Sequence, residues 1–187
     1  MSTNGSASSP RPARLEDMPT IGVAVAIPEP WATELQDYRA AVGDSTAAMI
    51  PTHITLVPPT EIDGELAEIE SHLADVATEV DAFAVHLRGT GTFRPVSPVV
   101  FVTLVEGISQ CELLADAVRR GPLEVDLAFP YHPHVTVAHH LDDTALDQAF
   151  DELADFECEF PVDGFHLYVH DQDHGWRPTR DFALGNR

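Results

Sequence analysis

The sequence contains no lysine, because all 10 of its basic residues are arginines. Chemistry that needs a lysine amine is therefore excluded, including Schiff-base formation, a lysyl-nucleotide intermediate and a Walker A phosphate site. An ATP-dependent ligase that carries its nucleotide on a lysine is excluded with them. Any reaction must use other side chains.

Long apolar runs are missing as well. No segment is long enough to span a bilayer, and the N-terminal segment lacks the apolar region of a secretory signal. The two cysteines, Cys111 and Cys158, do not have CxxC spacing, so we expect free thiols rather than a disulfide or a metal site. These absences predict a soluble, cytoplasmic protein that does not bind membranes.

Basic charge is scarce, because 31 acidic residues against 10 arginines give a formal net charge of -21. A field of this sign repels long nucleic acid, whose binding depends on neutralised phosphates. A nucleotide or a short RNA end can still bind in a locally favourable cleft. We expect a monomer that needs no cofactor and binds a small substrate of this kind.

Serine and proline are frequent in residues 1–18, which we expect to be a disordered leader. Residues 19–187 then form a single α+β domain. Apolar periodicity predicts its elements. Strands are expected at 20–27, 53–57, 82–93, 98–105, 134–139, 159–170 and 178–184, and helices at 29–42, 63–80, 108–120 and 143–153.

Helix and strand ends are predicted from the polar residues and prolines beside them. Pro58 and Pro59 are expected to end the second strand. Asp63 is expected to cap the second helix, and Asp142 or Asp143 the last one, since aspartate accepts hydrogen bonds from free backbone N–H groups.

Two short strings carry the strongest functional signal, His53-Ile54-Thr55 and His134-Val135-Thr136. Each lies in a predicted buried strand and closely follows a proline. Because side chains alternate along a strand, the histidine and threonine of each string point to one face and the apolar residues to the other. Two such pairs facing each other would provide two proton-transfer groups and two hydroxyl donors around one anion. This combination suits phosphate-ester chemistry without a metal.

The two strings also lie in similar surroundings. The order motif strand, helix, strand, strand occurs over residues 53–105 and again over 134–184, although the residues themselves differ. A duplicated unit related by an approximate two-fold axis would make the motif strands counterparts. We therefore expect them on opposite sides of one cleft.

The sequence resembles the two-histidine (2H) phosphoesterases, and in particular their bacterial 2′-5′ RNA ligase-like group. The resemblance rests on the two HxT strings, on residues 129–137 (FPYHPHVTV) and on residues 89–104 (GTGTFRPVSPVVFVTL). It extends over nearly all of residues 20–185. It implies a two-lobed, pseudo-symmetric α+β fold, with antiparallel sheets and outer helices around a central cleft.

The resemblance also implies an activity. Members of this family are metal-independent phosphodiesterases that open a 2′,3′-cyclic phosphate at an RNA end or on a nucleotide, with reverse 2′-5′ ligation as a weak side activity. Carried over residue by residue, His53 and His134 are the catalytic pair. Thr55 and Thr136 then bind the phosphoryl oxygens.

This sequence departs from the family pattern beside each motif. Many RNA-processing members have an arginine there, where this chain has Val57 and His139. The difference makes an RNA-end substrate less favoured than a smaller cyclic nucleotide or another short phosphodiester.

Four further residues are candidate substrate contacts. Tyr131 and His132 adjoin the second motif, and His86 and Arg88 share the polar face of one predicted strand. Trp176, at a predicted turn into the last strand, is expected to pack in the core or against a lobe, with stacking on a base as the alternative.

Two alternative functions stay open at this point. His132, His134 and His139 are spaced closely enough to suggest a metal site, which would make the protein a metal-dependent hydrolase. That alternative leaves the first HxT string unexplained. A noncatalytic nucleotide-binding module would keep the cleft without turnover.

Overall fold

The computed structural model describes residues 18–185. The predicted leader, residues 1–18, lies outside this range except for Met18. The strands are β1 (Thr20–Ala26), β2 (His53–Glu61), β3 (Phe83–Thr92), β4 (Val99–Glu106), β5 (His134–His139), β6 (Glu157–Val162), β7 (Gly164–Asp171) and β8 (Gly175–Ala183). The helices are α1 (Trp31–Val42), α2 (Leu66–Glu79), α3 (Ile108–Val118) and α4 (Asp143–Glu152), with short 3₁₀ helices at Ala47–Met49 and Gly121–Leu123.

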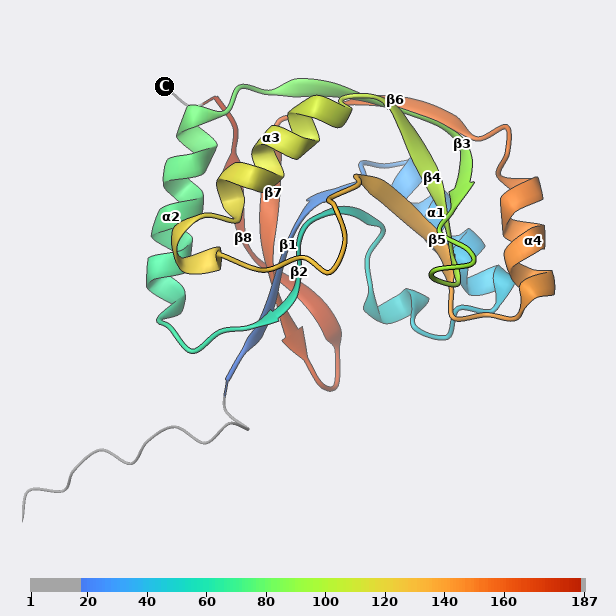
Figure 1. Ribbon diagram of the computed structural model, residues 1–187, viewed down its shortest axis with the longest axis horizontal. Helices are drawn as coiled ribbons and strands as arrows, with labels where there is room; N and C mark the ends of the chain where they lie inside the picture. Colours follow the sequence, from blue (N-terminus) through green and yellow to red (C-terminus); the bar gives the residue numbers. More distant parts are fainter. Residues whose placement is uncertain (1–17, 186–187) are drawn as a thin grey trace, which may run out of the picture.

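Two four-stranded antiparallel sheets form the two lobes (Figure 1). The first sheet has the strand order β2-β1-β7-β8, and the second has the order β5-β4-β3-β6. Helices α2 and α3 pack on the first sheet, while α1 and α4 pack on the second. The predicted α+β fold with two pseudo-symmetric lobes is confirmed.

The chain passes between the lobes in a repeated order. The series β1, α1, β2, α2 is matched by β4, α3, β5, α4. In each series the first helix crosses over: α1 contacts β5 of the second sheet, and α3 contacts β2 of the first. The motif strands β2 and β5 are therefore equivalent edge strands that contact each other. The repeat begins one strand earlier than the sequence suggested.

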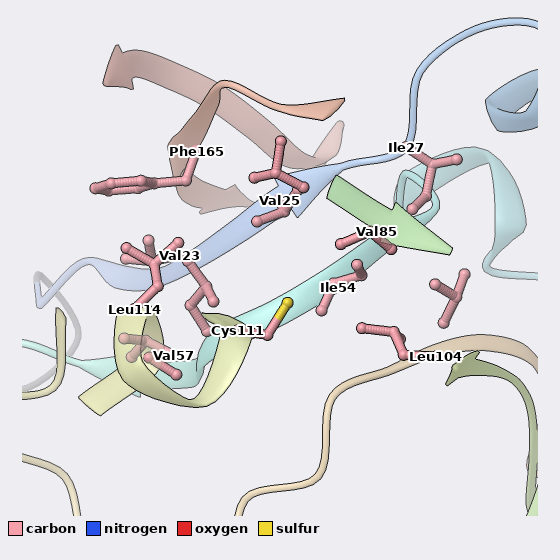
Figure 2. Close-up of a cluster of buried hydrophobic side chains, with 14 of the residues drawn as sticks. Val23, Val25, Ile27, Ile54, Val57, Val85, Leu104, Cys111, Leu114 and Phe165 are labelled. Atoms are coloured by element: carbon pink, nitrogen blue, oxygen red, sulfur yellow. The ribbon is translucent and has the colours of Figure 1, made fainter. Parts of the chain in front are cut away.

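Alternation in the motif strands buries one side of each strand. Ile54, Leu56, Val135 and Val137 are 0 % exposed. Leu114 of α3 lies in the same core beside β1 and β2 (Figure 2). Burying an aliphatic side chain of this size stabilises the fold by about 1.5–3 kcal/mol. These buried residues fix the two strands, so the histidine and threonine of each motif are held on the opposite side.

The predicted end of β2 was wrong. The strand continues through Pro58 and Pro59 to Glu61 instead of ending at Val57. Because β2 is an edge strand, a residue without an N–H group can be tolerated on its open side. Register irregularities on both sides of Val23 accommodate the extra β2 residues in this stretch.

The strand predicted at 159–170 is in fact two strands. β6 ends at Val162 and pairs with β3, whereas β7 begins at Gly164 and pairs with β1 of the other sheet. Asp163 lies where the chain changes lobes. Apolar alternation continues on both sides of it, so the sequence pattern did not reveal the crossing.

The cap prediction for α2 was also wrong. This helix begins at Leu66, and Glu65 is its N-cap residue, with extended backbone at φ -77° and ψ 128°. At α4 the prediction is confirmed, because the Asp142 side chain accepts a hydrogen bond from the Ala145 N–H at 2.9 Å. No helix within residues 18–185 has the length and apolar character needed to cross a bilayer.

Candidate active site

The first motif histidine is fixed by its own strand start. The Nδ1 atom of His53 lies 2.6 Å from the carbonyl oxygen of Pro51, and its Nε2 atom lies 3.1 Å from Oγ1 of Thr55. A carbonyl oxygen only accepts, so Nδ1 carries the proton of the neutral ring. Nε2 is then the nitrogen left to exchange a proton with a ligand.

The second motif histidine repeats this arrangement. The Nδ1 atom of His134 lies 2.7 Å from the carbonyl oxygen of His132, again two residues earlier in the chain. The same reasoning places the proton on Nδ1 and leaves Nε2 available. The two histidines are thus held in the same tautomer by equivalent backbone carbonyls.

One cavity of about 180 Å³ brings the two motifs together. Its lining includes His53 and His134, with Thr136 from the second motif. Thr55 lines the adjoining cavity, and its hydroxyl contacts His53, which lines both cavities. Three of the four histidines and threonines of the HxT strings thus line one cavity, and Thr55 lines the neighbouring cavity that shares His53 with it.

Both motif histidines are biased toward the neutral form. Burial lowers the pKa of His53, and the positive charge of Arg39 lowers it further, against the opposing effect of the Pro51 carbonyl. Burial likewise lowers the pKa of His134, and the charges of the His132 and His53 rings act in the same direction, against the opposing effect of the His132 carbonyl. Each imidazole is therefore less readily protonated than a free histidine, whose pKa is about 6.5.

An ion pair that the sequence did not predict adjoins the cavity. Arg39 of α1 and His139 of β5 both line it. The Arg39 guanidinium donates to Oδ2 of Asp44 through Nε at 3.1 Å and Nη2 at 2.9 Å, and to the Ile50 carbonyl through Nη1. The Nε2 atom of His139 lies 3.3 Å from the same Asp44 oxygen. Arg39 thus places a positive charge beside motifs that lack a flanking arginine.

Arg39 and Asp44 are almost fully buried, with 2 % and 6 % of their surfaces exposed. Burial tends to raise the pKa of Asp44, but hydrogen bonds from Thr46 and Arg39 hold it below its usual value. The signal in the sequence was a charged residue four positions after Leu35, on the apolar side of a predicted helix.

Aromatic rings surround His134. The ring of Phe93 meets it edge-on at 4.9 Å between centroids, and the ring of Phe101 lies at 5.2 Å. His132 stacks with His134 at 6.3 Å. These rings exclude water from one side of His134. This explains why burial is the largest of the effects that lower its pKa. His132 thus contacts the catalytic candidate both through its ring and through its carbonyl.

Tyr131 ties the two motifs together. Its hydroxyl donates to the Thr55 carbonyl at 2.7 Å, across the interface between the lobes. The guanidinium of Arg119 lies over the Tyr131 ring at 4.7 Å and also donates to the Leu56 carbonyl at 3.3 Å. The Tyr131 hydroxyl is therefore engaged with the protein backbone.

His86 and Arg88 lie away from both cavities that contain His53. His86 contacts Glu157 through Nε2 at 2.8 Å and Glu159 through Nδ1 at 3.3 Å. Arg88 is exposed on the same strand. The structure does not bring these two residues to the motif histidines.

The proposed metal set does not form a cluster. Within residues 18–185, no group of three or more His, Cys, Asp or Glu side chains is arranged to hold a metal ion. The Nδ1 atom of His134 faces the His132 carbonyl, while His139 faces Asp44. Cys111 and Cys158 are free thiols, as predicted, and both are buried.

Comparison with known proteins gives a consistent result. The family model described as "2′-5′ RNA ligase superfamily" matches residues 27–174. A protein of Bacillus cereus (strain ATCC 10987), named as a phosphoesterase, is 30 % identical over 145 residues, which are 76 % of this chain and 84 % of that protein. A protein of Bacillus thuringiensis (strain Al Hakam) with the same kind of name matches with the same identity and coverage.

Solved structures show the same fold. LigT of Escherichia coli in its apo form matches with a TM-score of 0.63 and 21 % identity, over 90 % of this chain and 99 % of LigT. A Thermus thermophilus protein also matches with a TM-score of 0.63 and 21 % identity, over 89 % of this chain and 98 % of its own.

Proposed function

The chain belongs to the 2′-5′ RNA ligase superfamily, and on this premise we propose that it is a metal-independent phosphodiesterase with two catalytic histidines. Its substrate is a 2′,3′-cyclic phosphate or a related short phosphodiester of a nucleotide or an RNA end, with weak reverse 2′-5′ ligation. One observation carries the proposal. His53 and His134, held in the same tautomer by backbone carbonyls, line one cavity, and in each ring Nε2 is the nitrogen that does not carry the proton.

The reaction needs one proton removed and one delivered. In the proposed step, Nε2 of His134 takes a proton from water as the water oxygen bonds to phosphorus. The bond from phosphorus to one ribose oxygen breaks, and the proton on Nε2 of His53 passes to that oxygen. The product is a phosphomonoester, and the two histidines have exchanged protonation states. Each proton transfer is typically worth about 10²- to 10⁴-fold in rate.

Thr55 and Thr136 are the proposed donors to the nonbridging oxygens. Their hydroxyls are fixed on rigid strands, so they need little reorganisation as charge develops in the transition state. Arg39 places a buried guanidinium, paired with Asp44, beside the same cavity.

Nucleotide ligands of a structural relative support the substrate class. Structures of Escherichia coli LigT contain 3′-AMP, ATP or NADP⁺. The net charge of -21 favours such a small ligand over long RNA.

A substrate panel tests the function. Purified protein is assayed with 2′,3′-cyclic AMP, 2′,3′-cyclic CMP, 2′-5′-linked dinucleotides and RNA ending in a cyclic phosphate, each with and without EDTA. We expect turnover of a cyclic phosphate that EDTA does not reduce. Loss of activity in EDTA, restored by a stoichiometric metal, would instead indicate a metal-dependent hydrolase. Tight nucleotide binding without turnover across the panel would indicate a binding module.

The pH dependence of the reaction follows from the lowered pKa values of His53 and His134. Catalysis needs one histidine neutral and the other protonated, and this combination is most populated between the two pKa values. Both lie below the ordinary value of about 6.5, so kcat/KM is expected to peak below pH 6.5 and to fall as the pH rises through neutrality. The optimum of kcat is expected at higher pH, since the bound phosphate anion stabilises an imidazolium. A plateau of kcat/KM up to pH 8 would contradict this assignment.

A further inference from the structure

A second cavity adjoins the first at His53. Its volume is about 150 Å³, and it lies over Gly22 and Ala24 of β1, on the face of the first sheet turned away from the core. Tyr168 and Trp176 border it on one side. Trp176 is not part of the core cluster and packs instead on the first lobe, the second of the two positions expected for it. Its indole lies against Gly22, where a Cβ atom would come within 3.4 Å of the ring.

The lining of this cavity is nearly free of charge. Among the described residues that line it there is no Asp, Glu or Arg, and its ionisable side chains are His53 and Tyr168. Burial, with a contribution from Asp181, raises the pKa of Tyr168 to about 12, so this side chain stays neutral at physiological pH. A flat, uncharged group fits this cavity better than a second phosphate.

The matching position beside His134 is filled. Ala24 pairs with Thr55, whereas Phe101 is the residue that pairs with Thr136 in the other lobe. The Phe101 ring covers Gly91, where a Cβ atom would lie only 2.6 Å away from it, and it packs on Phe93 at 4.5 Å. The pseudo-symmetry is therefore broken in one respect: small residues leave room beside the His53 motif, and rings occupy that room beside the His134 motif.

We propose that the cavity over Gly22 and Ala24 binds the base of a 2′,3′-cyclic mononucleotide, stacked on Trp176, with the cyclic phosphate between His53 and His134. This inference rests on the proposed function and names its substrate class. Every base offers an aromatic face, and few polar side chains here can read its edge, so purines and pyrimidines are both accepted. The base also sets the orientation, because it brings the ribose to the His53 side.

A ring-free substrate tests the proposal. Glycerol 1,2-cyclic phosphate has the reacting group but no base. In the unmodified protein, kcat/KM for 2′,3′-cyclic AMP is expected to exceed that for the glycerol compound on the order of 10- to 100-fold, as for other base–aromatic stacks. In Trp176→Ala this ratio is expected to fall close to 1, mainly through KM, and Trp176→Phe is expected to restore part of it.

A second variant guards against misfolding of Trp176→Ala. Ala24→Leu keeps the indole but fills the cavity, imitating the bulk that Phe101 provides in the other lobe. It is expected to lower the same ratio. Trp31→Phe is the matched control, because Trp31 packs on Phe160 at 6.2 Å and does not line the cavity. Its ratio is expected to equal that of the unmodified protein.

Fluorescence tests binding without turnover. The chain has two tryptophans, so Trp176 is the sole fluorescent indole in Trp31→Phe. Titration with 3′-AMP is expected to quench its emission, whereas glycerol phosphate is expected to leave it unchanged.

The outcomes separate the two proposals. A ratio near 1 in the unmodified protein, or an equal loss on both substrates in Trp176→Ala and Ala24→Leu, overturns the base-binding cavity and leaves the phosphodiesterase in place. If no cyclic phosphate is hydrolysed, the proposed function fails. The fluorescence titration with 3′-AMP then decides by itself whether the cavity binds a base. Quenching by 3′-AMP supports base binding, and its absence overturns it.

Discussion

Replacing either His53 or His134 by alanine is expected to lower kcat by about 10²- to 10⁴-fold. Each imidazole handles one of the two protons, and no other described histidine lines the cavity except His139, which faces Asp44. Because the two act as a unit, the double variant is expected to be little slower than either single one. The measurement is kcat on the best cyclic phosphate, with folding checked by circular dichroism.

Two comparisons sharpen this prediction. His174→Ala is the control, since His174 is exposed in the turn between β7 and β8, and its rate is expected to be unchanged. A p-nitrophenyl phosphodiester has a leaving group that needs no proton, so His53→Ala is expected to lose less on it than His134→Ala. The reverse order would exchange the acid and base roles. A folded variant with an undiminished rate would remove that histidine from the mechanism.

Local pattern was enough to predict the motif geometry. Alternation along a strand requires His53 and Thr55 to share a face, and in the structure Nε2 of His53 lies 3.1 Å from Oγ1 of Thr55. The repeated order of strands and helices also predicted that β2 and β5 are counterparts, because both halves of the chain pass through the same succession of elements. The first feature depends on residues near one another in the chain, and the second on the order of elements along it.

Features that depend on distant contacts were missed. Arg39 lies on α1, and its place beside the cavity follows from the crossing of that helix onto the second lobe. The contrast between Ala24 and Phe101 is visible only once each is paired with its motif threonine. In both cases the sequence shows the residue type, but not which residues lie beside it in the folded protein.

Arg39→Met is expected to destabilise the protein by about 3–5 kcal/mol, because it leaves the Asp44 carboxylate buried without its cationic partner. For a chain of this size the melting temperature should fall by on the order of 10 °C. The pH profile provides a second readout. Since the charge of Arg39 lowers the pKa of His53, its removal is expected to raise that pKa and to move the kcat/KM optimum to higher pH.

The double variant Arg39→Met, Asp44→Leu separates stability from electrostatics. Removing both charges leaves no unpaired buried ion, so part of the lost stability is expected to return. Thr46 then loses the Asp44 oxygen that accepts from its N–H and hydroxyl groups, which limits the recovery. The alkaline shift of the optimum is expected to persist, because the positive charge near His53 is still absent. An optimum that returns with stability would show that Arg39 acts only through folding, and one that stays shifted would show that its charge tunes His53.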